Sequence, residues 1–251
     1  MRNEKIVAVI PARMSASRFP GKPLAQLRGR PMLEHVFKRT KLCAALDEVY
    51  IATCDEEIAA AAKAFGAKAV MTSPKHERAT DRVAEVARGL TADIIVMVQG
   101  DEPMIEPEMI AASLEPFARD PSVVCVNLAA PIRSEAEFRD PNTIKVVMRE
   151  NGDALYFSRQ PIPTDQRLAF SQLPVYKQVC VIPFRREFLQ RFSELAPTPL
   201  EQAESIDMLR ALEHGFAVRL VKTDVATHAV DTLEDLRAVE ELMAREEARR
   251  A

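Results

Sequence analysis

The chain has 251 residues, of which 47% are hydrophobic and 28% charged, and its formal net charge is −3. This balance is typical of a globular protein, and the charge excludes a global field that would attract a nucleic-acid polymer. No apolar run approaches the roughly 18 residues of a membrane-spanning helix, and the start of the chain does not fit a signal peptide. We therefore expect a cytoplasmic protein, in which a nucleotide site would have to come from a local cluster of basic groups.

The first half of the chain alternates between strand-like and helix-like segments. Four segments are strand-like: 6–10, 49–52, 68–71 and 93–98, and the continuous apolar run at 6–10 is expected of a strand buried on both faces. Three segments between them have the apolar spacing of helices: 31–42, 55–66 and 79–90. Asp55 is a suitable N-cap for the second of these helices. The alternation predicts an α/β fold with a mostly parallel sheet and helices on both faces.

The second half is less regular. Four more segments are strand-like: 123–128, 143–148, 175–183 and 216–223. A charged helix with one apolar face is expected from residue 233 to the end, and the proline-rich stretch 161–174 is typical of a flap or a dimer arm. We expect a single domain, residues 1–251, in which about 129–183 form a dimerisation and acceptor-side insertion.

Two polar loops leave the carboxyl ends of predicted central strands, one at Pro11 and the other at Gln99. Ligands of open parallel sheets bind beyond those ends, so both loops should face one crevice. In the second loop, the carboxylate of Asp101 can bind a hard cation, and Gly100 lets the backbone lie close to a ligand. A plain turn residue is the alternative interpretation of Asp101.

The loop after the first strand carries three cations and two hydroxyls. These residues are Arg13, Ser15, Ser17, Arg18 and Lys22. A triphosphate binds to this combination, because cations balance its charge and hydroxyl and backbone donors reach its oxygens. The glycine spacing fits neither a Walker A loop nor a GxGxxG dinucleotide fingerprint. A solvated basic loop is the alternative, and its position after a buried strand makes that alternative less favourable.

Several long motifs follow one another over almost the whole chain. They are Pro-Ala-Arg at 11–13, Pro-Gly-Lys-Pro-Leu at 20–24, Gly-Arg-Pro-Met at 29–32, Val-Gln-Gly-Asp-Glu-Pro-Met-Ile at 98–105, Ala-Leu-Tyr-Phe-Ser-Arg at 154–159, Pro-Leu-Glu at 199–201 and Val-Asp-Thr-Leu-Glu-Asp-Leu at 230–236. In content and order they resemble the sugar-acid cytidylyltransferases, and most closely the 3-deoxy-manno-octulosonate (Kdo) cytidylyltransferases.

The resemblance implies a three-layer, Rossmann-like nucleotidyltransferase fold with a small dimerisation and acceptor subdomain. It also implies an enzyme that transfers CMP from CTP to Kdo and releases pyrophosphate, for the synthesis of lipopolysaccharide or capsule precursors. The expected cofactor is Mg²⁺, and the expected assembly is a homodimer.

The resemblance also assigns roles to individual residues. Asp101 and Asp231 are the expected metal ligands, although Asp231 could instead cap the last helix. The expected catalytic residues are Arg13, Lys22 and Asp101. The expected nucleotide-binding residues are Arg13, Ser15, Lys22, Thr80, Arg82 and Gln99, although Arg82 could lie on a helix surface. The expected acceptor-binding residues are Arg78, Arg159, Gln178 and Glu204.

The chain departs from the family pattern mainly on the acceptor side. Arg78-Ala79 replaces Ser-Gly, Gln178 and Ile182 replace the expected His and Tyr, and residues 204–210 are an altered version of a family helix. A pocket that loses hydrogen-bonding groups changes which substrate it prefers. A modified Kdo, another ulosonic acid or a phosphonate is therefore an alternative acceptor. A non-catalytic nucleotide-binding homologue is less favoured, because the expected catalytic and metal-binding residues are all present.

The four cysteines form no CxxC pair, and three of them have apolar neighbours in the sequence. Their spacing does not fit a zinc site. We expect free thiols, as in proteins of a reducing compartment.

Overall fold

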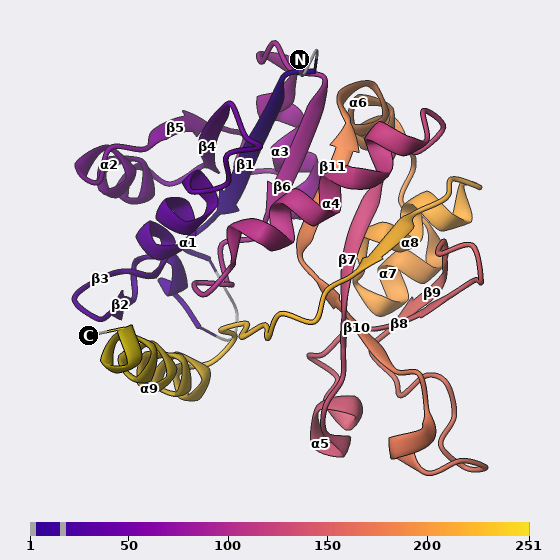
Figure 1. Ribbon diagram of the computed structural model, residues 1–251. Coiled ribbons are helices and arrows are strands. Elements are labelled where there is room, and N and C mark those ends of the chain that lie inside the picture. The colour runs from indigo at the N-terminus through magenta and orange to yellow at the C-terminus, as the bar shows by residue number, and fades with distance from the viewer. Residues whose placement is uncertain (1–3, 16–18, 251) are drawn as a thin grey trace. The chain divides into compact units, whose positions relative to one another are not determined.

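The computed structural model describes residues 4–15 and 19–250 and divides into two compact units (Figure 1). The first unit comprises residues up to 111 and from 227 onward, and the second comprises 112–226. The predicted insertion at about 129–183 lies within the second unit, which extends further in both directions. In the described part of the chain, no helix has both the length and the apolar character needed to cross a membrane.

The first unit is built on parallel strands whose apolar runs were predicted from the sequence. They are β1 (Ile6–Ala12), β4 (Glu48–Thr53), β5 (Lys68–Met71) and β6 (Ile94–Val98). Within this unit they lie in the order β6-β1-β4-β5, and each neighbouring pair is parallel. All five residues of β6 are buried, which explains its uninterrupted apolar sequence. The predicted α/β fold class is confirmed.

Three amphipathic helices connect these strands: α1 (Met32–Lys41), α2 (Glu56–Ala64) and α3 (Ala79–Arg88). Figure 1 shows α1 and α3 on opposite faces of the sheet. The chain steps outward from β1 to β4 and β5, and then α3 returns it to β6 on the other side of β1. The strand order therefore reverses between β1 and β6, and the crevice at such a reversal is where open α/β sheets bind ligands.

The C-terminal helix α9 (Leu233–Arg250) packs beside the short hairpin of β2 (Gln26–Leu27) and β3 (Arg30–Pro31) (Figure 1). Its apolar face, predicted from the sequence, contributes to a buried cluster with residues of the first unit. The cluster members are Leu27, Met32, Met104, Val230, Leu236, Val239 and Met243. The short helix η1 (Lys22–Leu24) precedes this hairpin directly, so α9 supports the segment that carries Lys22.

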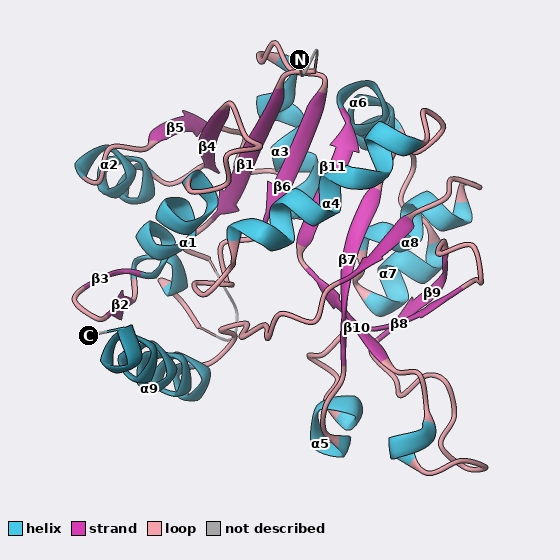
Figure 2. Cartoon of the chain, viewed as in Figure 1, coloured by secondary structure: helices cyan, strands magenta, loops and turns pink. Residues whose placement is uncertain are grey.

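The second unit contains a mixed five-stranded sheet in the order β12-β7-β10-β8-β9 (Figure 2). Its strands are β7 (Val126–Pro131), β8 (Lys145–Met148), β9 (Ala154–Ser158), β10 (Tyr176–Val179) and β12 (Arg219–Lys222). The other elements of this unit are β11 (Val181–Arg185), α5 (Glu135–Arg139), η2 (Phe170–Gln172), α6 (Arg186–Glu194), α7 (Pro199–Glu204) and α8 (Asp207–Glu213). Helix α4 (Pro107–Arg119) spans the boundary between the units.

Two sequence expectations are wrong in detail. The single strand expected at 175–183 is two strands, β10 and β11, which end and begin on either side of Cys180. The expected family helix at 204–210 is interrupted, because Ser205 has a φ of 55° and ends α7 in the left-handed region. Both breaks depend on pairing and packing with distant residues, which local apolar spacing does not reveal. The cysteines are free; two are buried and two are half-buried.

Candidate active site

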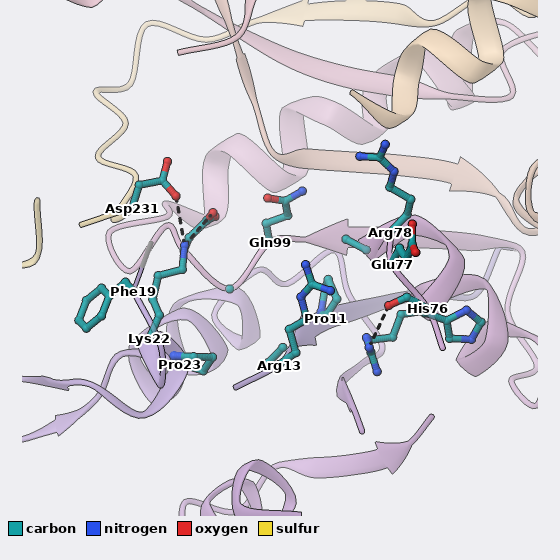
Figure 3. A pocket seen from close by; sticks show the side chains of 15 residues that line it. Pro11, Arg13, Phe19, Lys22, Pro23, His76, Glu77, Arg78, Gln99 and Asp231 are labelled. Atoms are coloured by element: carbon teal, nitrogen blue, oxygen red, sulfur yellow. Dashed lines mark hydrogen bonds and ion pairs between the residues drawn. The ribbon is translucent and has the colours of Figure 1, made fainter. Parts of the chain in front are cut away.

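A pocket of about 280 Å³ opens at the carboxyl ends of β1 and β6, within the first unit. The segments ahead of α3 and α9 complete its wall, so four stretches that are distant in the sequence meet there (Figure 3). The polar lining residues are Arg13, Lys22, His76, Glu77, Arg78, Arg82, Gln99, Asp101 and Asp231. The two loops that the sequence predicted to share a crevice, after Pro11 and Gln99, both line this pocket.

The Lys22 ammonium lies between the two predicted metal ligands. Its Nζ is 3.5 Å from Asp101 Oδ2 and 3.3 Å from Asp231 Oδ1, and it donates to the Val230 carbonyl at 2.9 Å. Each of the three charged side chains is between 16% and 24% exposed, so a ligand in the pocket can reach them. Asp231 therefore directs its carboxylate toward Lys22, into the pocket.

The carboxylate pair fits a magnesium site. Mg²⁺ is typically held by one or two carboxylates, with waters and substrate phosphates as the remaining ligands. The oxygens of Asp101 and Asp231 converge on one cationic atom, which shows that this position favours positive charge. In the described residues, no group of three or more His, Cys, Asp or Glu side chains is arranged to enclose a metal. Two carboxylates in an open pocket fit an ion whose other ligands are waters and the phosphates of a ligand.

Arg13 and Gln99 extend into the same part of the pocket (Figure 3). Neither side chain has a hydrogen-bonding or ionic partner within the part of the chain that the structure describes, so both are available to a ligand. Ser15 is exposed and is not among the lining residues. Ser17 and Arg18, which the sequence analysis added to this loop, lie outside the described residues.

The start of α3 forms the opposite wall. Arg82 is 3% exposed, so it does not lie on a helix surface. Its guanidinium donates to the Thr72 hydroxyl and, at 3.5 Å, to the His76 carbonyl, which ties α3 to the loop ahead of it. Thr80 is fully buried against Met97 and does not line the pocket. The structure thus gives Arg82 a clear role in holding the wall, while the predicted nucleotide contacts of Arg82 and Thr80 stay predictions.

His76 is held by Glu85 of α3. The Glu85 carboxylate accepts from the Ser73 N–H at 3.0 Å and contacts His76 Nε2 at 2.5 Å. Burial would raise the pKa of Glu85, but the Ser73 N–H and His76 outweigh it and lower the pKa below its usual 4.5. This carboxylate therefore stabilises the wall of the pocket in its ionised form.

We expect Glu85 to make this part of the fold acid-sensitive. A carboxyl group with a depressed folded pKa contributes stability that is present above its unfolded pKa and is lost as the pH falls through its folded pKa. The difference in unfolding free energy between wild type and Glu85→Gln should therefore be full at pH 7 and shrink below about pH 4.5. Urea unfolding of both proteins from pH 7 to pH 3 measures it, and a difference that does not depend on pH would contradict the assignment.

Three of the predicted acceptor-binding residues belong to the second unit. The Glu204 carboxylate accepts from the Ser158 hydroxyl at 2.7 Å, from the Tyr156 hydroxyl at 3.3 Å and from the Arg159 N–H at 2.8 Å. Burial and the nearby Glu204 carboxylate raise the pKa of Tyr156. Arg159 Nε in turn donates to the Glu204 carbonyl at 2.6 Å. The structure thus brings Glu204 and Arg159 together, and the contacts shown for them are within the protein.

Gln178 lies on β10, where its Nε2 donates to Asn127 Oδ1 at 2.6 Å. Asn127 is fully buried and donates to the carbonyls of Leu128 and Val179, so Gln178 completes a buried polar network. Arg78, the fourth predicted acceptor residue, lines the pocket of the first unit. Binding of an acceptor by these residues stays a prediction.

Sequence reasoning missed residues that act through the backbone. Asp235 accepts from the N–H groups of Asp231 and Thr232 at 3.0 and 2.8 Å, and so fixes the segment that carries Asp231. Its place three residues after Thr232 is the spacing of a helix cap, a signal that could have found it. Gly100, which was expected to let a ligand approach, lines the pocket, and an added Cβ would meet the Pro11 carbonyl oxygen at 3.4 Å, an ordinary contact distance. The approach of a ligand to Gly100 stays a prediction.

Comparison with known proteins identifies the fold and the chemistry together. A family model described as cytidylyltransferase matches residues 7–224, which include almost all of the pocket. The chain belongs to the cytidylyltransferase family. As a member of that family it is an enzyme that uses CTP, and this confirms the prediction of a CTP-dependent nucleotidyltransferase.

Its relatives resemble it over nearly their full lengths. A 3-deoxy-manno-octulosonate cytidylyltransferase of Geobacter metallireducens is 47% identical and covers 96% of this chain and 98% of the relative. One of Solibacter usitatus is 46% identical and covers 95% and 94%. The structure of a CMP:2-keto-3-deoxy-manno-octonic acid synthetase complexed with CTP superposes with a TM-score of 0.89, at 42% identity over 96% and 99% of the two chains. A 4-diphosphocytidyl-2C-methyl-D-erythritol synthase shares the fold at 16% identity.

Proposed function

We propose that this cytidylyltransferase transfers CMP from CTP to Kdo and releases pyrophosphate. The observation that carries the proposal is the pocket at the sheet reversal, which Arg13, Lys22, Asp101 and Asp231 line together, in a chain that matches a named Kdo cytidylyltransferase over 96% of its length. Lys22 and Arg13 offer charge for a triphosphate, and Asp101 and Asp231 offer oxygen ligands for the Mg²⁺ that nucleoside triphosphates carry.

The chemistry is an in-line displacement at the α-phosphorus of CTP. The acceptor hydroxyl loses its proton to solvent and forms the new P–O bond, the bond to the β-phosphate oxygen breaks, and pyrophosphate leaves with the electron pair of that bond. Arg13 and Lys22 lie at the loop after β1, where they hold the triphosphate and offset the negative charge that grows on its oxygens. Mg²⁺ bound by Asp101 and Asp231 would supply further neutralisation of that charge. Gln99 can donate to or accept from the nucleotide through its amide.

A non-catalytic homologue is disfavoured by the same geometry. Lys22, Asp101 and Asp231 come from three separate segments, and Lys22 Nζ lies within 3.5 Å of both carboxylates. The charged groups that a reaction of CTP with Mg²⁺ needs are therefore all present in one pocket. We propose further that the enzyme works in the cytoplasm and supplies an activated sugar acid for lipopolysaccharide or capsule assembly.

The acceptor is the part of the proposal that a direct assay decides. We expect pyrophosphate release with CTP and Kdo to exceed that with modified Kdo, other ulosonic acids and phosphonates, because Kdo cytidylyltransferases of similar sequence match the chain throughout. The departures at Arg78, Gln178 and Ile182 motivate the comparison. A clear preference for one of the other acids would contradict Kdo as the acceptor and identify that acid as the substrate instead.

We also propose a homodimer, in which the proline-rich stretch 161–174 of the second unit contributes to the contact. Leu168 in this stretch is a large apolar residue that is 50% exposed. Light scattering of the purified protein tests the proposal, and the mass of a single chain would contradict it.

A further inference from the structure

Strand β1 is held at both of its ends by an aspartate from the neighbouring chain segment. Along the β1–β4 ladder, each residue of β1 pairs with one 41 positions later, from Val7 with Glu48 to Ala12 with Thr53. If the same register is extended one residue before Val7, Ile6 lies opposite Asp47. If it is extended two residues beyond Ala12, Met14 lies opposite Asp55. At both points the aspartate side chain accepts the hydrogen bond.

The two bonds are alike in chemistry. Asp47 Oδ2 accepts from the Ile6 N–H at 2.7 Å, and Asp55 Oδ2 accepts from the Met14 N–H at 2.8 Å. Both are partly buried, charge-assisted bonds between residues 41 positions apart, and such bonds are stronger than neutral ones. They differ in place, because Ile6 begins the strand and Met14 lies in the loop that lines the pocket.

Asp55 occupies the N-cap position of α2, as the sequence predicts, but its side chain makes no bond to that helix. Caps are favoured because the side-chain oxygen satisfies a free N–H of the first turn. Here the carboxylate instead accepts from Met14, and the Asp55 N–H donates to the Thr53 hydroxyl at 3.1 Å, which orients the residue. The Asp55 side chain therefore stabilises the loop after β1 rather than the first turn of α2.

A second hydrogen bond connects Met14 to the segment that carries Lys22. Its carbonyl accepts from the Gly21 N–H at 3.0 Å, and Gly21, with a φ of 75°, is the residue from which η1 begins. The left-handed backbone at Gly21 suits glycine, since a side chain there would be strained. Hydrogen bonds thus link Asp55 to Met14 and Met14 to Gly21, and they hold the two ends of the loop together. Arg13 is the neighbour of Met14 and Lys22 the neighbour of Gly21, so each cation of the pocket lies beside one of these bonded residues.

We propose that Asp55 is a positioning residue for the nucleotide: its carboxylate fixes Met14, and through Gly21 it sets where Arg13 and Lys22 meet a triphosphate. The inference rests on the proposed function of those two cations. Asp55 does not line the pocket, so it acts through the backbone of the loop and touches no reacting atom. Removal of the carboxylate frees the Met14 N–H and with it the placement of both cations.

The experiment compares Asp55→Ala with Asp47→Ala, which removes the matching bond at the other end of the same strand. CTP binding is measured by calorimetry with Mg²⁺ present, KM and kcat by pyrophosphate release, and stability by urea unfolding. We expect Asp55→Ala to weaken CTP binding about tenfold and to raise KM for CTP more than it lowers kcat. Asp47→Ala should cost similar stability and leave CTP binding within about twofold of wild type.

Asp55→Asn is the conservative variant, because its Oδ1 can still accept from the Met14 N–H. It should recover CTP binding to within about threefold of wild type. Equal CTP binding by Asp55→Ala, Asp47→Ala and wild type would overturn this inference and leave the proposed function intact. Equal weakening by both alanine variants would also overturn it, because the loss would then follow stability. Failure of wild type to bind CTP would overturn the proposed function itself.

Discussion

Replacement of Asp101 with alanine should lower Mg²⁺-dependent release of pyrophosphate from CTP by at least about a hundredfold. Asp101 and Asp231 offer the oxygens that can hold Mg²⁺ against the triphosphate, and one carboxylate alone leaves the ion and the developing charge poorly held. The fold should survive, because Asp101 holds the Val230 segment through its backbone carbonyl, which accepts from the Val230 N–H at 2.8 Å.

Three measurements separate catalysis from stability in this variant. Turnover is followed by pyrophosphate release over a range of Mg²⁺ concentrations, metal binding by titration with Mn²⁺, and folding by urea unfolding. The control is Asp93→Ala, an exposed carboxylate that accepts from the Lys5 N–H at 2.7 Å near the opposite end of the strands. Asp101→Ala should lose turnover and weaken Mn²⁺ binding, and Asp93→Ala should lose neither. Persistence of Mg²⁺-dependent turnover in Asp101→Ala would show that the metal assignment is wrong.

The sequence was most informative where burial and chemistry impose a strict pattern. Strand β6 is buried throughout, so its sequence is uninterruptedly apolar and its end is unmistakable. Since a polar Gln-Gly-Asp follows that end, the pocket could be placed at the edge of the sheet from the sequence. Strand β1 is likewise buried and apolar, and the basic loop that follows it in the sequence could be placed at the same edge. The order of the strands depends on how distant segments pair, and the sequence does not reveal it. All parallel strands end at the same edge of the sheet, however, so the two loops meet there whatever that order is.

The sequence was least informative where a residue acts through the backbone of another segment. Asp55 fits the pattern of a helix cap, and the Met14 bond appears only once β1 and β4 are paired in register. Arg82 could have lain on a helix surface, and its burial against Thr72 depends on how α3 packs. The break at Ser205 depends on the pairing of α7 with α8, which local propensity does not encode.

Removal of the Arg210 side chain should destabilise the protein by about 3–5 kcal/mol. Arg210 and Glu201 are 4% and 1% exposed, and the guanidinium donates twice to the carboxylate, at 2.8 and 2.6 Å. Phe192 lies under the guanidinium at 4.8 Å, so an aromatic face and a carboxylate together replace water around this cation. Arg210→Met leaves the Glu201 carboxylate buried without its main partner, and that unpaired charge carries most of the cost.

Urea unfolding of Arg210→Met tests this, with Arg119→Ala as the matched control. Arg119 pairs with Glu115 at 2.7 Å, but these side chains are 77% and 56% exposed, so their loss should cost no more than about 1 kcal/mol. A second variant, Glu201→Met with Arg210→Met, removes both charges and should recover part of the stability. A cost below about 1 kcal/mol for Arg210→Met alone would contradict the assignment of a buried pair.

The buried Arg210–Glu201 pair also supports the region that is predicted to bind the acceptor. It joins α7 to α8 across the left-handed turn at Ser205, and Glu204 lies directly before that turn. Since Glu204 holds Ser158 and the Arg159 N–H, loosening of this turn should spread to the end of β9. We therefore expect Arg210→Met, at a temperature where it remains folded, to raise KM for the sugar-acid acceptor more than KM for CTP. The pocket proposed to bind CTP is lined by residues of the first unit, so equal effects on both KM values would contradict the proposal that residues of the second unit around Glu204 bind the acceptor.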